Sequence, residues 1–399
     1  MRLMNFRQYN NVTSITIPNR VTVTQPISIF QGMQNLVTAT LPNRVKSLKF
    51  SYFGCSNFAG PSICGNNVTD MYAAYTSCTN MTGSPVCGPK VTNMAQAYYG
   101  CSKITGDAAC GDNVTNMYSA YGNCTSLSGN AACGANVVDM SHAYSDCRNL
   151  AGRPACGPNV TNMYYAYYEC SNLTGSPVCG VNVTDMSGAY FGCSSLTGHP
   201  VCGNSVTNMC YAYSDCANLT GSPVCGENVI DMSGAYSCCV NLTGVPACGQ
   251  NVVDMSSAYW QGGHFTRPII GPNVTNAEQA YSGCTFDVDY VLVNELPAHY
   301  SRMFEGCTDF NLCFISSDFT EPQDIANDLL DLPSVNNEYP WTTEVAGDEQ
   351  DPSYYRCYTG RGRGAIIYVF PDAGKYDAFR IDNASRSFCQ LVENYGVNN

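Results

Sequence analysis

Cysteine is the residue type whose number and spacing could carry chemistry in this chain. Most of the 25 cysteines fall into two columns, each with an interval of 23 residues. The first column is Cys55, Cys78, Cys101, Cys124, Cys147, Cys170, Cys193, Cys216 and Cys239; the second is Cys64, Cys87, Cys110, Cys133, Cys156, Cys179, Cys202, Cys225 and Cys248. Thiols in such arrays could bind metal, form disulfides or pack as small apolar side chains.

The spacing favours the last of these three interpretations. Structural zinc sites use pairs of cysteines two to four residues apart, whereas the intervals here alternate between 9 and 14 residues. Disulfide frameworks are typical of small secreted domains, and columns in register would offer every thiol two equivalent neighbours. Near the ends of the columns, Cys is replaced by Met33, Gly262 and Ile270. A metal site or a disulfide would not accept these replacements. We predict a buried thiol ladder, with disulfides confined at most to the off-column residues Cys313, Cys357 and Cys389.

No other set of residues has a catalytic pattern. The four histidines, His142, His199, His264 and His299, lie in different repeats. No Ser/His/Asp set, paired-carboxylate signature or Gly-rich nucleotide motif accompanies them. We therefore expect a protein that is not an enzyme and that uses neither a cofactor nor a metal.

The 23-residue period itself predicts the architecture, because self-similarity at a fixed period is typical of a solenoid whose units pack only on their neighbours. In one repeat, Met186, Ala189, Tyr190 and Cys193 stand at i, i+3, i+4 and i+7, the apolar stripe of a short helix. Asp185 precedes this stripe and reads as an N-cap. A proline-containing segment before it reads as a short strand. We expect an α/β repeat fold of about thirteen coils, each a short strand, a turn and a short helix or 3-10 turn.

Two early repeats carry a family resemblance. The segment Val12-Thr-Ser-Ile-Thr-Ile-Pro-Asn-Arg-Val21 is echoed by Val37-Thr-Ala-Thr-Leu-Pro-Asn-Arg-Val45, and Ala-Tyr-x-x-Cys-x-x-Leu follows downstream. Together these segments resemble the BspA-like leucine-rich repeats of bacterial surface and phage-encoded proteins, over roughly residues 11–315. The resemblance implies a right-handed leucine-rich-repeat-like stack. The second cysteine column and the missing secretion signal depart from the family pattern and leave its function open.

The repeats end near residue 316, so we expect two regions. Residues 1–316 form the solenoid, with Phe310–Ile315 as its last strand. Residues 317–399 form an acidic linker over 318–352 and a small β-containing unit, in which Ala365–Phe370 and Tyr376–Ile381 are predicted to make a hairpin. This C-terminal unit is either a cap over the solenoid end or an attachment module.

Charge is sparse and uneven. The net charge is −13 with 12% charged residues, where about 25% is usual. Residues 1–55 carry six bases and no acid, whereas residues 271–399 carry 20 acids and seven bases. A basic end and an acidic end could favour docking of one copy to another, or to a partner, through these ends. The alternative is that a small number of charges is unevenly distributed by chance. No basic face with interleaved aromatics indicates nucleic acid, no apolar run reaches the length of a membrane span, and no N-terminal signal peptide is visible.

Aromatic pairs recur at or near the repeat interval, and one ring of each pair could lie exposed on the helix side. Rigid aromatic rings suit a glycan or protein partner, although they could instead fill space between coils. The candidate helix-side residues are Tyr99, Tyr165, Tyr168, Phe191, Tyr211, Trp260 and His264. We expect these rings, and the 259–267 segment where the period slips by one residue, to bind a partner in preference to the strand side.

The strand side offers an alternative site. The third residue after the Leu of each repeat changes from coil to coil between small, charged and apolar side chains, as in Asp107, Arg153 and Val245. One buried core could not accept all of these, so we expect this position to face solvent. Its candidate binding residues are Asp107, Asn130, Arg153 and His199. Twelve Asn-x-Ser/Thr sequons also occur, which the repeat turns explain without glycosylation.

These observations lead to a non-enzymatic recognition or structural protein. The leading hypothesis is a phage virion surface component, such as a fibre, adhesin or capsid decoration, that binds a host surface glycan or another protein. The alternatives are a bacterial cell-surface adhesin and an intracellular scaffold in the cytoplasm. Homo-oligomerisation is possible in each case.

Overall fold

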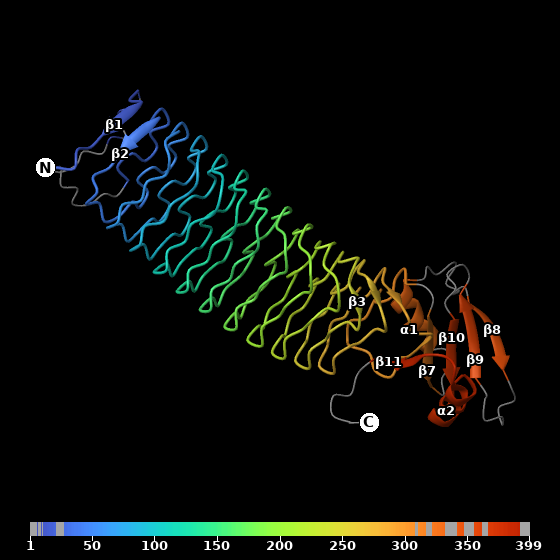
Figure 1. Cartoon of the computed structure of the whole chain (residues 1–399). Coiled ribbons are helices and arrows are strands. Elements are labelled where there is room, and N and C mark those ends of the chain that lie inside the picture. Colours follow the sequence, from blue (N-terminus) through green and yellow to red (C-terminus); the bar gives the residue numbers. More distant parts are fainter. Residues whose placement is uncertain are drawn as a thin grey trace. The chain divides into compact units, whose positions relative to one another are not determined.

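The computed structural model describes residues 6, 9, 11–20, 28–307, 310–316, 321–331, 341–346, 355–360 and 366–391. It divides into two compact units, Met1–Val206 (unit 1) and Thr207–Asn399 (unit 2). Unit 1 is a series of coils stacked side by side, coloured blue to green in Figure 1. Among the described residues, no helix combines the length and apolarity that a membrane crossing requires.

In the described part of unit 1, regular strands occur only in the first coils. β1 (Ser14–Thr16) pairs in parallel with β2 (Thr38–Thr40). From Ser47 onward, neighbouring coils are joined by isolated parallel bridges such as Asp70↔Asn93 and Asn93↔Asn116. The predicted short strand of each coil is thus reduced to single bridging residues in most of the unit.

Of the two predicted forms of this segment, the short α-helix is wrong and the 3-10 turn survives only as single i→i−3 turns, because alternate backbone donors go to the next coil. The N–H groups of Met71 and Ala73 donate to the carbonyls of Asn93 and Ala95 at 2.9 Å, and Tyr75 continues this alternation. Between them, the N–H of Ala74 bonds Met71 O at 3.0 Å, an i→i−3 turn. An α-helix would direct these donors four residues back along its own chain, which would leave none for the neighbour. The described residues of the coils contain no α-helix.

Two columns of left-handed residues make this alternation possible. The second and sixth residues after each Met have positive φ, for example Ser119 at 50° and Asn123 at 60°. Positive φ costs roughly 1–2 kcal/mol for a residue with a Cβ. The lateral hydrogen bonds and the burial of the coil interior offset this strain.

The core of unit 1 is a set of stacked columns. Val, Met, Ala, Tyr, Leu and the first-column Cys recur in it, and from Met94 to Leu196 each of these column residues is at most 1% exposed. The tyrosine rings stack nearly parallel, as in Tyr98–Tyr121 and Tyr144–Tyr167 with centroids 5.4 and 5.3 Å apart. The i, i+3, i+4, i+7 pattern therefore identified the buried side chains correctly although the backbone is not helical.

Unit 2 begins with further coils and ends in a mixed sheet. The short strands β3 (Thr243–Gly244), β4 (His264–Phe265) and β5 (Thr285–Phe286) form a parallel three-stranded sheet. A second sheet has the order β11-β6-β7-β10-β9-β8. Its strands are β6 (Tyr290–Leu292), β7 (Asn311–Ile315), β8 (Trp341–Ala346), β9 (Tyr355–Gly360), β10 (Ile366–Phe370) and β11 (Phe388–Gln390). Helices α1 (Glu321–Leu330) and α2 (Ala373–Asp382) both contact β10 of this sheet and are seen in orange and red in Figure 1.

Three expectations for the C-terminal region need correction. Residues 373–382 are helix α2 and not the second strand of a hairpin, because Asp372 caps it by accepting a hydrogen bond from Lys375 N at 3.0 Å. The expected linker contains helix α1 and strand β8. The strand expected at 310–315 is present as β7, but it is central in the sheet, between β6 and β10.

Candidate functional site

The first cysteine column consists of buried thiols that bond the backbone. Cys78 Sγ lies 3.0 Å from Tyr52 O, and Cys170 Sγ lies 3.0 Å from Tyr144 O. Burial raises the pKa of Cys101 and Cys147 to about 12, so these thiols stay protonated and can donate. The column therefore joins successive coils through S–H bonds.

The second cysteine column is half-buried. Cys110 Sγ accepts the N–H of Gly134 in the next coil at 3.2 Å. Burial raises its pKa to about 11. A Cβ on Gly134 would lie 2.6 Å from Gly111 O, so only glycine permits this approach between coils. Neither column gathers a metal site, since the part of the chain that is described contains no group of three or more His, Cys, Asp or Glu placed to hold an ion.

Tyrosine hydroxyls tie each coil across its interior. Tyr167 Oη donates to Ala155 O at 2.6 Å and accepts from Ala155 N at 2.8 Å. The same reciprocal pair recurs at Tyr144 with Ala132. Because both partners belong to one residue of the opposite wall, the tyrosine fixes the width of its own coil.

A contiguous group of partly exposed rings lies on the outside of unit 1. The aromatic surface, as we call it, consists of Tyr118, His142, Tyr164, Tyr165, Tyr168 and Phe191. The predicted site residue Tyr99 is also partly exposed, but its ring is not in contact with this group in the structure. His142 stacks on Tyr165 with ring centroids 5.5 Å apart, and Tyr165 meets Tyr168 edge-on at 5.1 Å. Tyr168 in turn stacks on Phe191 at 5.2 Å.

Three members of this surface were not among the predicted site residues. Tyr118 and Tyr164 are 40% and 39% exposed and contact His142 edge-on. They occupy the position directly after the Met of their coils, which varies between coils, as Tyr118, Ser141 and Ser187 show.

On sequence grounds, His142 is considered only as a catalytic residue, for which it has no partner. In the structure its planar ring contacts Tyr118, Tyr164 and Tyr165. Burial lowers the pKa of His142, and the nearby carboxylate of Asp139 has the opposite, smaller effect.

The predicted residues of unit 2 are less closely grouped. Tyr211 is 43% exposed. Trp260 is half-buried, and its carbonyl accepts from Cys238 N at 2.8 Å. His264 is exposed on β4, where its ring bonds Thr285 Oγ1 at 2.8 Å and Asp287 Oδ1 at 2.6 Å.

The period slip at 259–267 has a backbone cause. At Gly263 the chain passes so close to Leu242 O that a Cβ could not be accommodated. This approach brings β4 beside β3, with Thr243 paired to His264. The irregularity therefore marks the start of the three-stranded sheet.

The alternative strand-side residues form a separate exposed column. Asp107, Asn130, Arg153 and His199 are all exposed, as predicted. Asp107 Oδ1 accepts from Asn130 N and Nδ2 at 2.7 and 2.9 Å, and these bonds lower the pKa of Asp107. The small side chains of this column lie over glycines of the next coil, as Ser176 does over Gly198.

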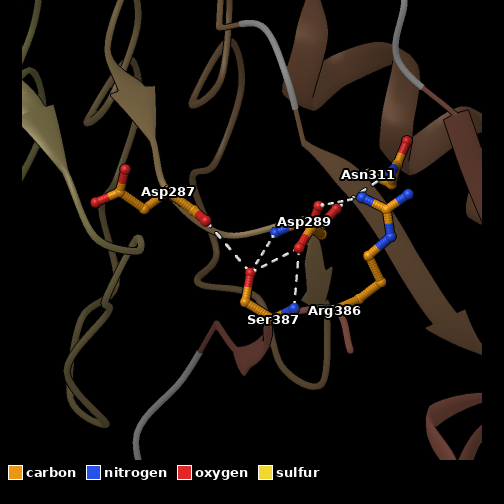
Figure 2. A network of polar contacts seen from close by, with 5 residues as sticks. All are labelled: Asp287, Asp289, Asn311, Arg386 and Ser387. Atoms are coloured by element: carbon orange, nitrogen blue, oxygen red, sulfur yellow. Dashed lines mark hydrogen bonds and ion pairs between the residues drawn. The ribbon is translucent and has the colours of Figure 1, made fainter. Parts of the chain in front are cut away.

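A polar clamp that the sequence analysis did not predict holds the C-terminal segment of unit 2. The carboxylate of Asp289 accepts from Ser387 N and Oγ at 2.9 Å and from Arg386 at 3.2 Å, as Figure 2 shows. These contacts, led by the Ser387 N–H, lower the pKa of Asp289. The clamp leads directly into β11, which pairs with β6, so its role is structural.

The Asn-x-Thr sequence of the repeats builds a hydrogen-bonded ladder along unit 1. Asn136 Nδ2 donates to Asp112 O at 2.8 Å, and Asn182 Nδ2 to Pro158 O at 2.9 Å. Beside this column, Thr115 Oγ1 donates to Thr92 O at 3.1 Å. These contacts give the sequons a structural reason. The Asn and Thr side chains also line an open groove from Asn113 to Ser205.

The comparisons with known proteins agree with these repeats. A family model described as BspA type leucine-rich repeat region matches residues 4–128 in six copies. This match confirms the predicted resemblance for just under a third of the chain. No curated protein matches.

Two solved structures are similar to the chain at 14% identity. One is a leucine-rich repeat protein from Bacteroides ovatus, with a TM-score of 0.46 over 77% of this chain and 93% of that one. The other is a leucine-rich cell surface protein from Faecalibacterium prausnitzii, with a TM-score of 0.38 over 81% and 92%.

Proposed function

We propose that this protein is a non-enzymatic recognition protein, displayed on the exterior of a virion or a bacterial cell, that binds a glycan or protein through the aromatic surface of unit 1. One observation carries the proposal: rings from four successive coils, from Tyr118 to Phe191, contact one another on the outside of unit 1.

Rigidity makes these rings suitable anchors. Their backbone is held on both sides by lateral hydrogen bonds, as where Tyr165 N donates to Ser187 O at 2.9 Å and His142 N to Tyr164 O at 2.8 Å. Tyrosine presents a large amphipathic area with little rotamer entropy to lose, and tyrosine is enriched among residues that dominate interface energy. The strand-side column offers mostly small polar side chains, which rarely supply such anchors.

The BspA-type repeats support an exterior location for this protein, because the repeats that they resemble occur in bacterial surface proteins and in phage-encoded proteins. Of the two locations we propose the virion surface, with the bacterial cell surface as the alternative. Immunogold labelling of intact particles and cells from the source tests this placement. Label confined to the cytosol would contradict an exterior role, and label on cells but not particles would favour the bacterial adhesin.

Other coils supply conservative replacements for testing the aromatic surface. Ser141 and Ser187 stand at the position of Tyr118 and Tyr164, so the Tyr118→Ser/Tyr164→Ser variant introduces side chains that the fold already uses there. We expect this variant to lose about tenfold or more in binding of the labelled full chain to host cells, since each anchor contributes a kilocalorie or more.

The matched control changes the strand side. Arg153→Ser/His199→Ser introduces the residue found at Ser176 in the same column, and we expect unchanged binding. Trp260→Ala/His264→Ala tests the predicted anchors of unit 2 separately. If the strand-side variant abolishes attachment and the tyrosine variant does not, the strand side is the binding face.

A further inference from the structure

The Asn/Thr ladder that lines the open groove of unit 1 continues beyond the groove into a basic region. The column that contains Asn113 runs back through Lys90 and Asn67 to Arg44, and each step is 23 residues. Side-chain bonds follow it: Lys90 Nζ donates to Asn67 Oδ1 at 3.2 Å, and Asn67 Nδ2 to Asn43 O at 3.4 Å.

The neighbouring column continues in the same way. Thr92 Oγ1 donates to Thr69 O, and Thr69 Oγ1 donates to Lys46 O, each at 3.1 Å. Arg44, Lys46 and Lys90 are exposed, and the chain has no acidic residue before Asp70. One end of the ladder is therefore cationic, and the rest is lined by amides and hydroxyls.

We propose that this groove binds a linear anionic polysaccharide along the ladder, at a site distinct from the aromatic surface. A ladder hydroxyl such as that of Thr115 donates its proton along the stack and can still accept, and an amide such as that of Asn136 has a second N–H and its oxygen, which suits the hydroxyl groups of a sugar chain. Arg44, Lys46 and Lys90 would pair with the carboxylates of the glycan.

The repeat geometry supports an extended ligand. Seven steps separate Arg44 from Ser205, which at the spacing of parallel bridges corresponds to roughly 34 Å. A sugar unit in an extended chain has a length similar to one such step, so successive units can meet equivalent side chains.

Other extended polymers fit less well. A peptide added as a strand needs unpaired backbone groups, whereas the backbone here bonds the adjacent coils, as in Thr115 N to Thr92 O at 2.9 Å. A single-stranded nucleic acid gains much of its affinity from bases that stack on aromatic side chains. The open groove is lined by Asn, Thr, Val and Ser side chains and presents no aromatic ring.

The test measures binding of the full chain to oligogalacturonates of increasing length, with maltooligosaccharides as the neutral probe. We expect affinity for the acidic series to rise with length until the ladder is filled, and to fall with salt. Equal binding of the neutral series, or no binding of the acidic series, would overturn the proposal.

Two variants use residues that other coils carry at the same positions. Arg44→Asn/Lys46→Thr/Lys90→Asn removes the cations, and we expect about a tenfold loss of affinity and a weaker salt dependence. Thr115→Val/Thr184→Val copies Val138 and should weaken binding without changing the salt dependence. Unaltered binding by both variants would place the ligand elsewhere.

Lys103→Asn is the matched control. Lys103 bonds Asn80 Oδ1 at 2.6 Å in a different exposed column, so its loss changes the net charge without touching the groove. We expect its affinity to stay within twofold of the unaltered protein. An equal loss in this variant would indicate non-specific attraction and overturn the site. The groove variants leave the aromatic rings in place, so failure here would not affect the proposed function.

Discussion

The ring of Tyr165 lies over Gly188 of the next coil, where a Cβ would come within 2.6 Å of its Cε1 atom. Gly188 has φ +58°, and the same position carries Ser119, His142 and Tyr165 itself in earlier coils. Glycine at this step therefore gives the ring room to lie against the backbone.

Replacing this glycine should displace the ring. Gly188→Ala adds the cost of a left-handed Cβ and a steric overlap, so we expect a loss of about 1–3 kcal/mol in the free energy of unfolding. Chemical denaturation measures the loss, and Tyr165→Ala/Gly188→Ala should recover part of it. If the double variant recovers nothing, the ring contact is not the cause. Ser119→Gly, at the equivalent position with φ 50°, should be neutral or slightly stabilising.

The buried tyrosine hydroxyls should be important for stability. Tyr167→Phe leaves both the N–H and the carbonyl of Ala155 without their partner, so we expect a cost of about 1–3 kcal/mol. Tyr99→Phe removes the hydroxyl of a ring that is 36% exposed and should change stability by less than about 0.5 kcal/mol. Equal effects in the two variants would contradict the cross-coil role of the hydroxyl.

Alkaline pH should unfold the protein through its thiols. The pKa values of Cys55, Cys101 and Cys147 are raised to about 12 by burial, whereas an unfolded thiol has a pKa of about 8.5. The folded state then holds more protons, so this stabilisation is complete below about pH 8.5 and is lost as pH rises towards 12.

Three such thiols would together cost about 4 kcal/mol for each pH unit above this threshold. Urea titrations at stepwise higher pH measure the slope. A stability that stays flat up to pH 11 would mean that the column is not buried as the structure indicates.

The thiol ladder also predicts a pattern of alkylation. In the folded protein, half-buried second-column residues such as Cys110 and Cys156 should react with iodoacetamide before buried first-column residues such as Cys147 and Cys170. After denaturation without reductant, most column cysteines should react. Mass spectrometry of peptides reads both states, and a majority that becomes reactive only after reduction would identify disulfides.

The sequence predicted which side chains are buried more reliably than it predicted the backbone. Met186, Ala189, Tyr190 and Cys193 are all fully buried, as their spacing indicated. The spacing of apolar residues does not show which carbonyl each backbone N–H group bonds. A helix and a stack of laterally bonded turns would bury the same four positions. The small or polar residues at the sixth position after Met, such as Asn123 and Gly192, were the available signal, since they tolerate positive φ.

The candidate site shows the same division. The repeat alignment located exposed positions such as Arg153 and Tyr99, because variation within one chain reports solvent contact. It did not reveal that His142 stacks on Tyr165 in the next coil, which depends on rotamers set by neighbouring coils. Contacts over long separations, such as that between Asp289 and Ser387, leave no periodic signal at all.

The lateral hydrogen bonds of unit 1 also determine how it would respond to mechanical load. A pull along the stacking direction loads the bonds of one coil after another, so they break in sequence and not all together. Each detached coil releases 23 residues, or about 80 Å of extended chain. Under tension, unit 1 would therefore lengthen in repeated steps of nearly equal size, each yielding at low force. Such a series of steps limits the force that reaches whatever is attached at either end.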